Sequence, residues 1–239
     1  MEHGKKYTEV AKQVDGKKTY KLDEAIALLK KTSYVKFDPT IELHFRLGID
    51  PRHADQQVRS TAVLPHGTGK QVRILVFTQG EGEILARQAG ADFVGSDDLI
   101  KQIEGGWTDF DIAVATPEQM GKVGKLGKIL GRRGLMPNPK SGTICQPSEL
   151  PRVIQETRRG KVEFRNEPKA GLIHVGVGKL SFSEQQIREN VLNLIEGIVR
   201  NKPSGAKGIY IRSITLTSTM GPGIHLEVNP TLAEVGNTN

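Results

Sequence analysis

The sequence is poor in cysteine, aromatic residues and long apolar runs. Cys145 is the only cysteine among 239 residues, so the chain can form no internal disulfide, and we expect a reducing compartment. Aromatic residues make up 5% of the chain, which disfavours a protein that stacks single-stranded bases on aromatic platforms. No run of about 18 apolar residues occurs, and residues 1–6 contain no apolar segment of a secretory signal. We therefore expect a cytoplasmic protein that binds no membrane.

The sequence also lacks the motifs of common nucleotide and metal enzymes. Gly121 and Gly127 have the wrong spacing for a P-loop, and Lys128 is not followed by the serine or threonine that the motif needs. The histidines show no zinc-ligand spacing, and no Gly-x-Ser-x-Gly sequence occurs. Asp109 and Asp111 are an imaginable carboxylate pair, but we interpret them as the end of a turn and the start of a strand. We expect no catalytic residue, no metal site and no cofactor.

Positive charge is what the chain has in excess. Its formal net charge of +7 favours an anionic partner. The stretch 121–142 is rich in glycine and contains no acid, and its cations are Lys122, Lys125, Lys128, Arg132, Arg133 and Lys140. Glycine lets a backbone approach a ligand closely, and cations attract phosphates. This pattern suggests a loop that faces phosphate or nucleic acid, and a solvated basic loop without a ligand is the alternative.

Hydrophobic periodicity changes twice along the chain. Residues 5–31 have the spacing of two short helices, and residues 41–49 alternate between apolar and polar side chains as in a half-buried strand. Between residues 72 and 115, short apolar strands alternate with helices, which is typical of a parallel sheet. From residue 161 onward, amphipathic strands return around one long helix.

Finer signals occur in the last third of the chain. Ser183 and Gln186 have the spacing of a capping box at the start of that long helix. The apolar alternation slips between Ile211 and Ile214, which predicts a β-bulge. The tail from Asn229 is polar, and we expect it to be loose.

These patterns predict a composite domain interrupted by an insertion. We expect residues 1–67 and 160–239 to form one α+β domain, an antiparallel sheet with helices that contains both chain ends. Residues 68–159 are expected to form an inserted α/β domain of the Rossmann-like, three-layer kind. The chain crossings near 65–70 and 158–161 would then act as a paired hinge.

Two stretches of the composite domain have the composition of contact surfaces. Phe37 lies beside Lys36 at the entrance of a strand, where it could stack on a partner, and a core position for Phe37 is the alternative. A row of alternate hydroxyl residues begins at Ser213 and ends at Met220 and Gly221. Hydroxyls suit hydrogen bonding to ribose and phosphate, whereas a solvated threonine strand is the alternative.

Several segments resemble one known family. The sequence Gly-Lys-Ile-Leu-Gly-Arg-Arg-Gly-Leu-Met-Pro-Asn-Pro-Lys at 127–140 resembles the signature of the large-subunit ribosomal protein L-one family, in its bacterial form. Further matches, among them Lys36-Phe37-Asp38 and Thr219-Met220-Gly221-Pro222, extend the resemblance over essentially the whole chain. Arg132 departs from the signature, because proline is more common there, and the change makes the segment more basic.

The resemblance implies a function without catalysis. It implies a structural protein of the large subunit that binds ribosomal RNA, forms the mobile stalk at the tRNA exit site and assists release of deacylated tRNA. The partners so implied are large-subunit ribosomal RNA, exit-site tRNA and the messenger RNA of its own operon, whose translation it would repress. We expect a monomer when free, located on cytoplasmic ribosomes. A free translational repressor and an enzyme that binds a phosphorylated ligand on the insert are the alternatives.

The resemblance also implies where RNA binds. The matching positions are Lys36, Phe37, Thr40, Glu42, Lys161, Arg165, Lys169, His174, Ser213, Thr217, Thr219, Met220 and Gly221. Glu42 would accept a hydrogen bond from ribose or base, since a carboxylate repels phosphate. The cations of 121–142 would make a secondary contact with RNA or tRNA.

Overall fold

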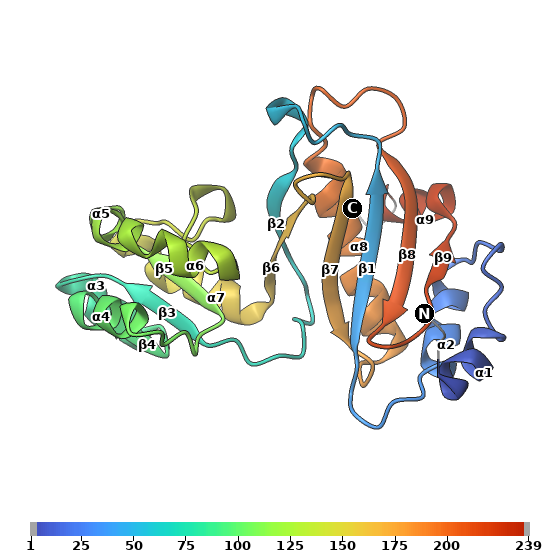
Figure 1. Cartoon of the computed structure of the whole chain (residues 1–239), viewed down its shortest axis with the longest axis horizontal. Helices are drawn as coiled ribbons and strands as arrows, with labels where there is room; N and C mark the ends of the chain where they lie inside the picture. Colours follow the sequence, from blue (N-terminus) through green and yellow to red (C-terminus); the bar gives the residue numbers. More distant parts are fainter. Residues whose placement is uncertain (1–3, 237–239) are drawn as a thin grey trace. The chain divides into compact units, whose positions relative to one another are not determined.

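The structure, a computed structural model, describes residues 4–236 and divides into two compact units (Figure 1). The terminal unit contains the described residues up to Gly69 and those from Gly160 onward, and the inserted unit comprises Lys70–Arg159. Both units mix helices with strands. The sheets of the terminal unit are antiparallel and that of the inserted unit is parallel, which confirms the predicted mixed fold.

A four-stranded sheet in the order β7-β1-β8-β9 is the centre of the terminal unit. Its strands are β1 (Thr40–Leu47), β7 (Leu172–Lys179), β8 (Ile211–Ser218) and β9 (Ile224–Leu226). The apolar side chains of β1 alternate into the core, as its sequence predicts. The predicted bulge is confirmed, because Arg46 pairs with Ser213 while Leu47 pairs with Ile211, which leaves Arg212 as the extra residue.

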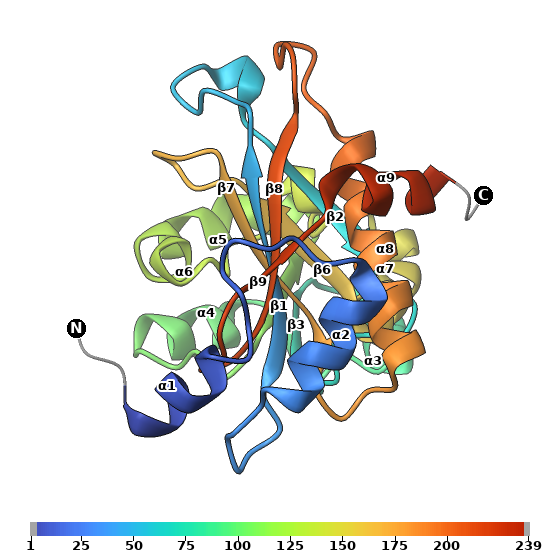
Figure 2. The same cartoon turned by 90° about the vertical axis from the view of Figure 1, so that its right-hand side faces the viewer.

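Three helices cover one face of this sheet (Figure 2). They are α2 (Leu22–Lys31), α8 (Glu184–Arg200) and α9 (Val228–Gly236), and a short exposed helix α1 (Lys5–Ala11) precedes them. The capping box of Ser183 and Gln186 starts α8 as predicted. Up to Gly236 the expectation of a loose tail from Asn229 is wrong, because Thr231 and Val235 are buried against the core and stabilise α9; residues 237–239 lie outside the described residues.

A small two-stranded sheet lies where the chain leaves and re-enters the terminal unit. It pairs β2 (Arg59–Val63) with β6 (Lys161–Arg165), and a 3-10 turn at Ala54–Gln56 precedes β2. Gly160 has a φ of 111°, and a Cβ on it would lie 2.4 Å from the Cα of Gly67. Only glycine allows the two chain crossings to approach this closely.

The inserted unit is built on a parallel sheet in the order β4-β3-β5. Its elements are β3 (Ile74–Phe77), α3 (Glu81–Gln88), β4 (Phe93–Gly95), α4 (Asp97–Glu104), β5 (Ile112–Ala115), α5 (Met120–Val123), α6 (Gly127–Arg133) and α7 (Leu150–Arg159). Leu75 and Phe77 pack in a core with α4 and α6, whereas Ile74 and Val76 pack in another with α3 and α7. Alternate residues of β3 thus serve opposite faces, and helices cover both.

The basic stretch 121–142 is mostly helical, so the expectation that it forms a loop is wrong. It consists of α5, two 3-10 turns at Gly124–Leu126 and Pro139–Ser141, and α6. Val123, Leu126 and Leu130 are buried at helical spacing, and this burial outweighs the weak helix propensity of glycine. Gly134, with a φ of 71°, ends α6 in the left-handed conformation that glycine favours.

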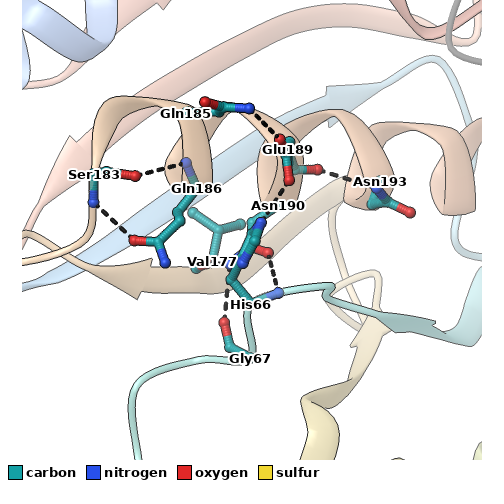
Figure 3. Close-up of polar contacts among 9 residues, drawn as sticks. All are labelled: His66, Gly67, Val177, Ser183, Gln185, Gln186, Glu189, Asn190 and Asn193. Carbon is teal, nitrogen blue, oxygen red and sulfur yellow. Dashed lines mark hydrogen bonds and ion pairs between the residues drawn. The ribbon is translucent and has the colours of Figure 1, made fainter.

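One buried side chain holds the first chain crossing onto α8 (Figure 3). Asn190 is 0% exposed, and its Oδ1 accepts the backbone N–H of His66 at 3.1 Å. Its Nδ2 donates to the carbonyl oxygens of Gly67, at 2.9 Å, and Val177, at 2.7 Å. On the surface beside it, the His66 imidazole lies 2.5 Å from the Glu189 carboxylate. A single amide therefore ties the crossing to both α8 and β7.

Replacing Asn190 by alanine should destabilise the protein strongly. Three backbone groups would lose their partner, and we expect a loss of about 3 kcal/mol in the free energy of unfolding. Asn193→Ala is a matched control, because Asn193 lies on the same helix and, among the described residues, donates only to the carbonyl of Glu189 one turn earlier. Urea unfolding of the two variants would measure this. Equal losses would contradict the role assigned to Asn190.

Candidate nucleic-acid interface

Within the described part of the terminal unit, α2, α8 and α9 cover one face of the four-stranded sheet, and we call the opposite face the open face. Its side chains alternate with the buried ones along each strand. They include Thr40, Glu42, His44 and Arg46 of β1, His174 of β7, Ser213, Thr215 and Thr217 of β8, and His225 of β9. None of them is buried. The structure therefore brings five residues of the predicted RNA surface onto one face: Thr40, Glu42, His174, Ser213 and Thr217.

Two loops meet at one end of the open face, and we call them the loop end. One loop precedes β1 and contains Lys36 and Phe37; the other follows β8 and contains Thr219, Met220 and Gly221. Backbone bonds join them, because the Thr219 amide donates to the Thr40 carbonyl at 2.9 Å. The Thr219 hydroxyl accepts the Thr40 amide at 3.1 Å. These five predicted residues therefore lie together beside the open face.

The loop end presents two apolar side chains to solvent. Phe37 is 54% exposed, so the alternative of a core position for it is wrong. Met220 is 65% exposed and has a φ of 68°, which a residue with a side chain rarely adopts. Its carbonyl accepts a hydrogen bond from the Tyr34 hydroxyl at 2.8 Å, which holds this conformation. Gly221 closes the turn, since a Cβ there would lie 2.4 Å from the Ser218 hydroxyl.

A row of hydrogen-bonding side chains crosses the middle of the open face. Nδ1 of His44 lies 2.7 Å from Nδ1 of His174, so one ring donates and the other accepts. Next to His44 on β8, the Thr215 hydroxyl lies 3.0 Å from Nδ1 of His225. Sequence reasoning found His174 but missed His44 and His225. Their alternation with apolar residues places each on the polar side of its strand, but only the strand register puts them in one row.

The row is flanked by two acids. Nε2 of His44 lies 3.8 Å from Glu42, and Nε2 of His174 lies 3.3 Å from Glu167. Burial lowers the pKa of His44, and the neighbouring His174 lowers it further, while Glu42 opposes this in part. The lowered pKa favours the neutral form of the His44 imidazole at the centre of the open face.

Three predicted residues lie outside the open face. Lys161 and Arg165 are on β6, which pairs with β2 in the small sheet. Arg165 lies opposite Arg59, whose Nε is 2.6 Å from the Glu163 carboxylate. Lys169 is exposed in the turn between β6 and β7. These cations share the terminal unit with the open face but do not extend its row.

The cations predicted for a secondary contact differ in exposure and in whether another side chain binds them. Lys122 is 2.8 Å from the Asp97 carboxylate, and Arg133 donates to the Thr108 hydroxyl. Four others are exposed side chains: Lys125, Lys128, Arg132 and Lys140. Lys125, Lys128 and Arg132 have helical spacing, so α6 and the turn before it carry a narrow basic stripe.

The inserted unit is a poor site for a phosphorylated ligand. The first turns of α3 and α4, at the carboxyl ends of the strands, contain four acids: Glu81, Glu83, Asp97 and Asp98. Such charges repel phosphate from the helix ends that would otherwise attract it. Within residues 4–236 no group of three potential metal ligands occurs, and no helix is long and apolar enough to cross a bilayer.

Asp111, one of the two acids considered as a carboxylate pair, forms ion pairs with two basic side chains. Its carboxylate is 2.5 Å from Lys70 and 3.2 Å from Arg73. Burial alone would raise its pKa, but the hydrogen bonds from Lys70 and Arg73 lower it to about 2. Asp111 therefore holds the start of β5 in place, as a structural carboxylate.

Comparison with known proteins identifies the family. The sequence model of the ribosomal protein L1p/L10e family matches residues 29–222. The chain belongs to this family. "Large ribosomal subunit protein uL1" of Chloroflexus aggregans is 59% identical over 227 residues, which cover 95% of each chain. The protein of the same name from Thermomicrobium roseum is 54% identical, over 97% of this chain and 96% of its own. That from Dehalococcoides mccartyi strain BAV1 is 53% identical, over 98% of both.

Family membership settles the class of function. The protein is a structural component of the large ribosomal subunit, and the alternative of an enzyme is wrong. The resemblance seen in the signature at 127–140 is thereby confirmed, since these residues lie inside the matched range. As a ribosomal protein it is located on the ribosome.

The His44 environment predicts a pH dependence of stability. Because folding lowers the pKa of His44 from 6.5, the unfolded chain binds a proton there more readily than the folded chain does. The contribution of neutral His44 to the free energy of unfolding is complete above about pH 6.5. It is lost as the pH falls through the pKa that His44 has in the folded protein. His44→Gln should therefore flatten the decline in unfolding free energy between about pH 7 and 5, measured by urea unfolding. An unchanged slope would contradict this account of His44.

Proposed function

We propose that the protein binds large-subunit ribosomal RNA through the open face and the loop end. The observation that carries this proposal is the uncovered sheet face, which presents hydroxyl and imidazole groups where a self-contained fold would place another layer. Exposed apolar residues, Phe37 and Met220, stand at one end of it. A partner that offers many hydrogen-bonding groups and some apolar base surface fits this combination.

Each part of the surface has a role in this proposal. Thr217 and Ser213 exchange hydrogen bonds with ribose hydroxyls and phosphates, whereas Glu42 accepts only from ribose or base. Phe37 and Met220 contact bases that leave the helical stack. Phosphates are also attracted by four cations of the terminal unit, and this attraction weakens with salt. These cations are Lys36, Lys161, Arg165 and Lys169.

We further propose that the inserted unit, a Rossmann-like domain, makes a secondary contact with RNA or tRNA. Lys125, Lys128 and Arg132 form the exposed stripe that supports this role. The crossings near 65–70 and 158–161 would let the unit move as part of the mobile stalk at the exit site, where it assists release of deacylated tRNA. The unit is a compact body linked by only two chain segments, which is the arrangement that such motion requires.

The same surface would serve a second, regulatory role. A messenger RNA of the protein's own operon that presents a similar structure would meet the same open face, and binding would repress its translation. Because both RNAs use one surface, ribosomal RNA would compete with the messenger. The free protein, in this proposal a cytoplasmic monomer, is the form that represses.

Met220→Ala tests the proposed RNA surface. The change removes an apolar side chain that RNA would bury, so we expect the affinity for a ribosomal RNA fragment with the binding junction to fall roughly tenfold or more. Ile84→Ala is the matched control, because Ile84 is an exposed apolar residue on α3 of the inserted unit. Filter binding or fluorescence anisotropy would measure both. If the two variants bound equally well, the loop end would not be part of the RNA surface.

A further inference from the structure

A polar cleft lies at the end of the sheet opposite the loop end. It has a volume of about 450 Å³ and is open to solvent. Its lining residues come from the chain that follows β1 and the chain that leads into β8: Gly48, Ile49, Asp50, Gln56, Gly205, Lys207 and Arg212. Because β1 and β8 are antiparallel, these two segments meet at the same edge of the open face.

The walls of the cleft are held by close backbone contacts. A Cβ on Gly48 would lie 2.1 Å from the Ile209 carbonyl oxygen, and one on Gly205 would lie 2.4 Å from the Asp55 carboxylate. The Gly48 amide donates to the Tyr210 carbonyl at 2.7 Å. The two segments therefore pack backbone against backbone at Gly48, where no side chain would fit between them.

Two cations line the cleft without an acidic partner among the described residues. Lys207 and Arg212 are exposed and take part in no ion pair within residues 4–236. Arg212 is the extra residue of the bulge in β8 and pairs with no residue of β1. Its Nε lies near Gly48 at the wall of the cleft. Of the two acids at the cleft, Asp55 stands against Gly205, and Asp50 already accepts the Arg52 amide at 3.0 Å and lies 4.0 Å from His53.

We propose that this cleft is a phosphate-binding subsite for the RNA that lies on the open face, with Lys207 and Arg212 as its ligands. The inference rests on the proposed function and extends it to the far end of the sheet. Thr40 at the loop end and Arg46 beside the cleft are six residues apart on β1, or about 20 Å. A nucleic-acid backbone presents several phosphates over that length. One RNA that contacts the loop end therefore reaches the cleft with its backbone.

The chemistry of the subsite predicts contacts without base preference. Lysine and arginine bind phosphodiester oxygens by charge-assisted hydrogen bonds, and arginine does so with two parallel donors. Such contacts add affinity and salt dependence but do not read sequence. The cleft should accordingly strengthen binding to ribosomal RNA and to any related messenger alike.

The salt dependence of RNA binding by the full-length protein tests this. The double variant Lys207→Ala with Arg212→Ala should reduce the slope of log affinity against log salt by about two units, one for each lost phosphate contact. The affinity at low salt should fall roughly tenfold for the junction RNA and for a mismatched RNA. The variant should melt at the wild-type temperature, because both side chains are exposed.

A control variant separates a site from general charge. Lys12→Ala with Lys21→Ala removes the same charge from exposed lysines that flank α1 and α2. The exchange Lys207→Arg with Arg212→Lys should keep most of the salt slope. A slope for the double alanine variant equal to that of the control would overturn the subsite while leaving the proposed RNA surface intact. Failure of the wild-type chain to bind the junction RNA would overturn the proposed function itself.

Discussion

The pairing of β1 with strands from the other end of the chain is the interaction on which the structure depends. β1 is bonded to β7 on one side and to β8 on the other, and His44 and His174, which meet across the first pair, are 130 residues apart. The sheet therefore cannot form until the inserted unit has been closed off as a loop. Gly160 packed on Gly67, and Asn190 bonded to the crossing, hold the ends of that loop. Such non-local pairing requires the closure of a long loop, which costs conformational entropy and slows folding.

The same register decides what the sheet can bind. Alternation along β1 sends Leu43 and Phe45 under the helices and His44 and Arg46 to the open face. A slip by one residue would exchange the two sets and bury charges, so burial of the apolar set fixes the polar set in place. The arrangement of polar side chains on the open face is thus a by-product of core formation. Its rigidity comes from the sheet and does not depend on the partner.

The sequence predicted those features that depend on local patterns. The alternation of β1, the capping box at Ser183 and the bulge after Ile211 are each encoded within a few residues, and all three were correct. Features decided by distant contacts were missed. The tail forms α9 because Val235 finds a place in the core, and the glycine-rich stretch becomes helical because Leu130 and its neighbours are buried. The histidine row and the cleft needed the strand register, which no local pattern contains.

Hydrogen exchange of the full-length protein, with and without the ribosomal RNA junction, tests the central claim most directly. If RNA lies on the open face, the amides of β1 and β8, of the 33–39 loop and of the 218–223 loop should gain protection on binding. Helices α2, α8 and α9, on the opposite face, should exchange as in the free protein. Protection confined to those helices or to the inserted unit, with the open face unchanged, would contradict the account.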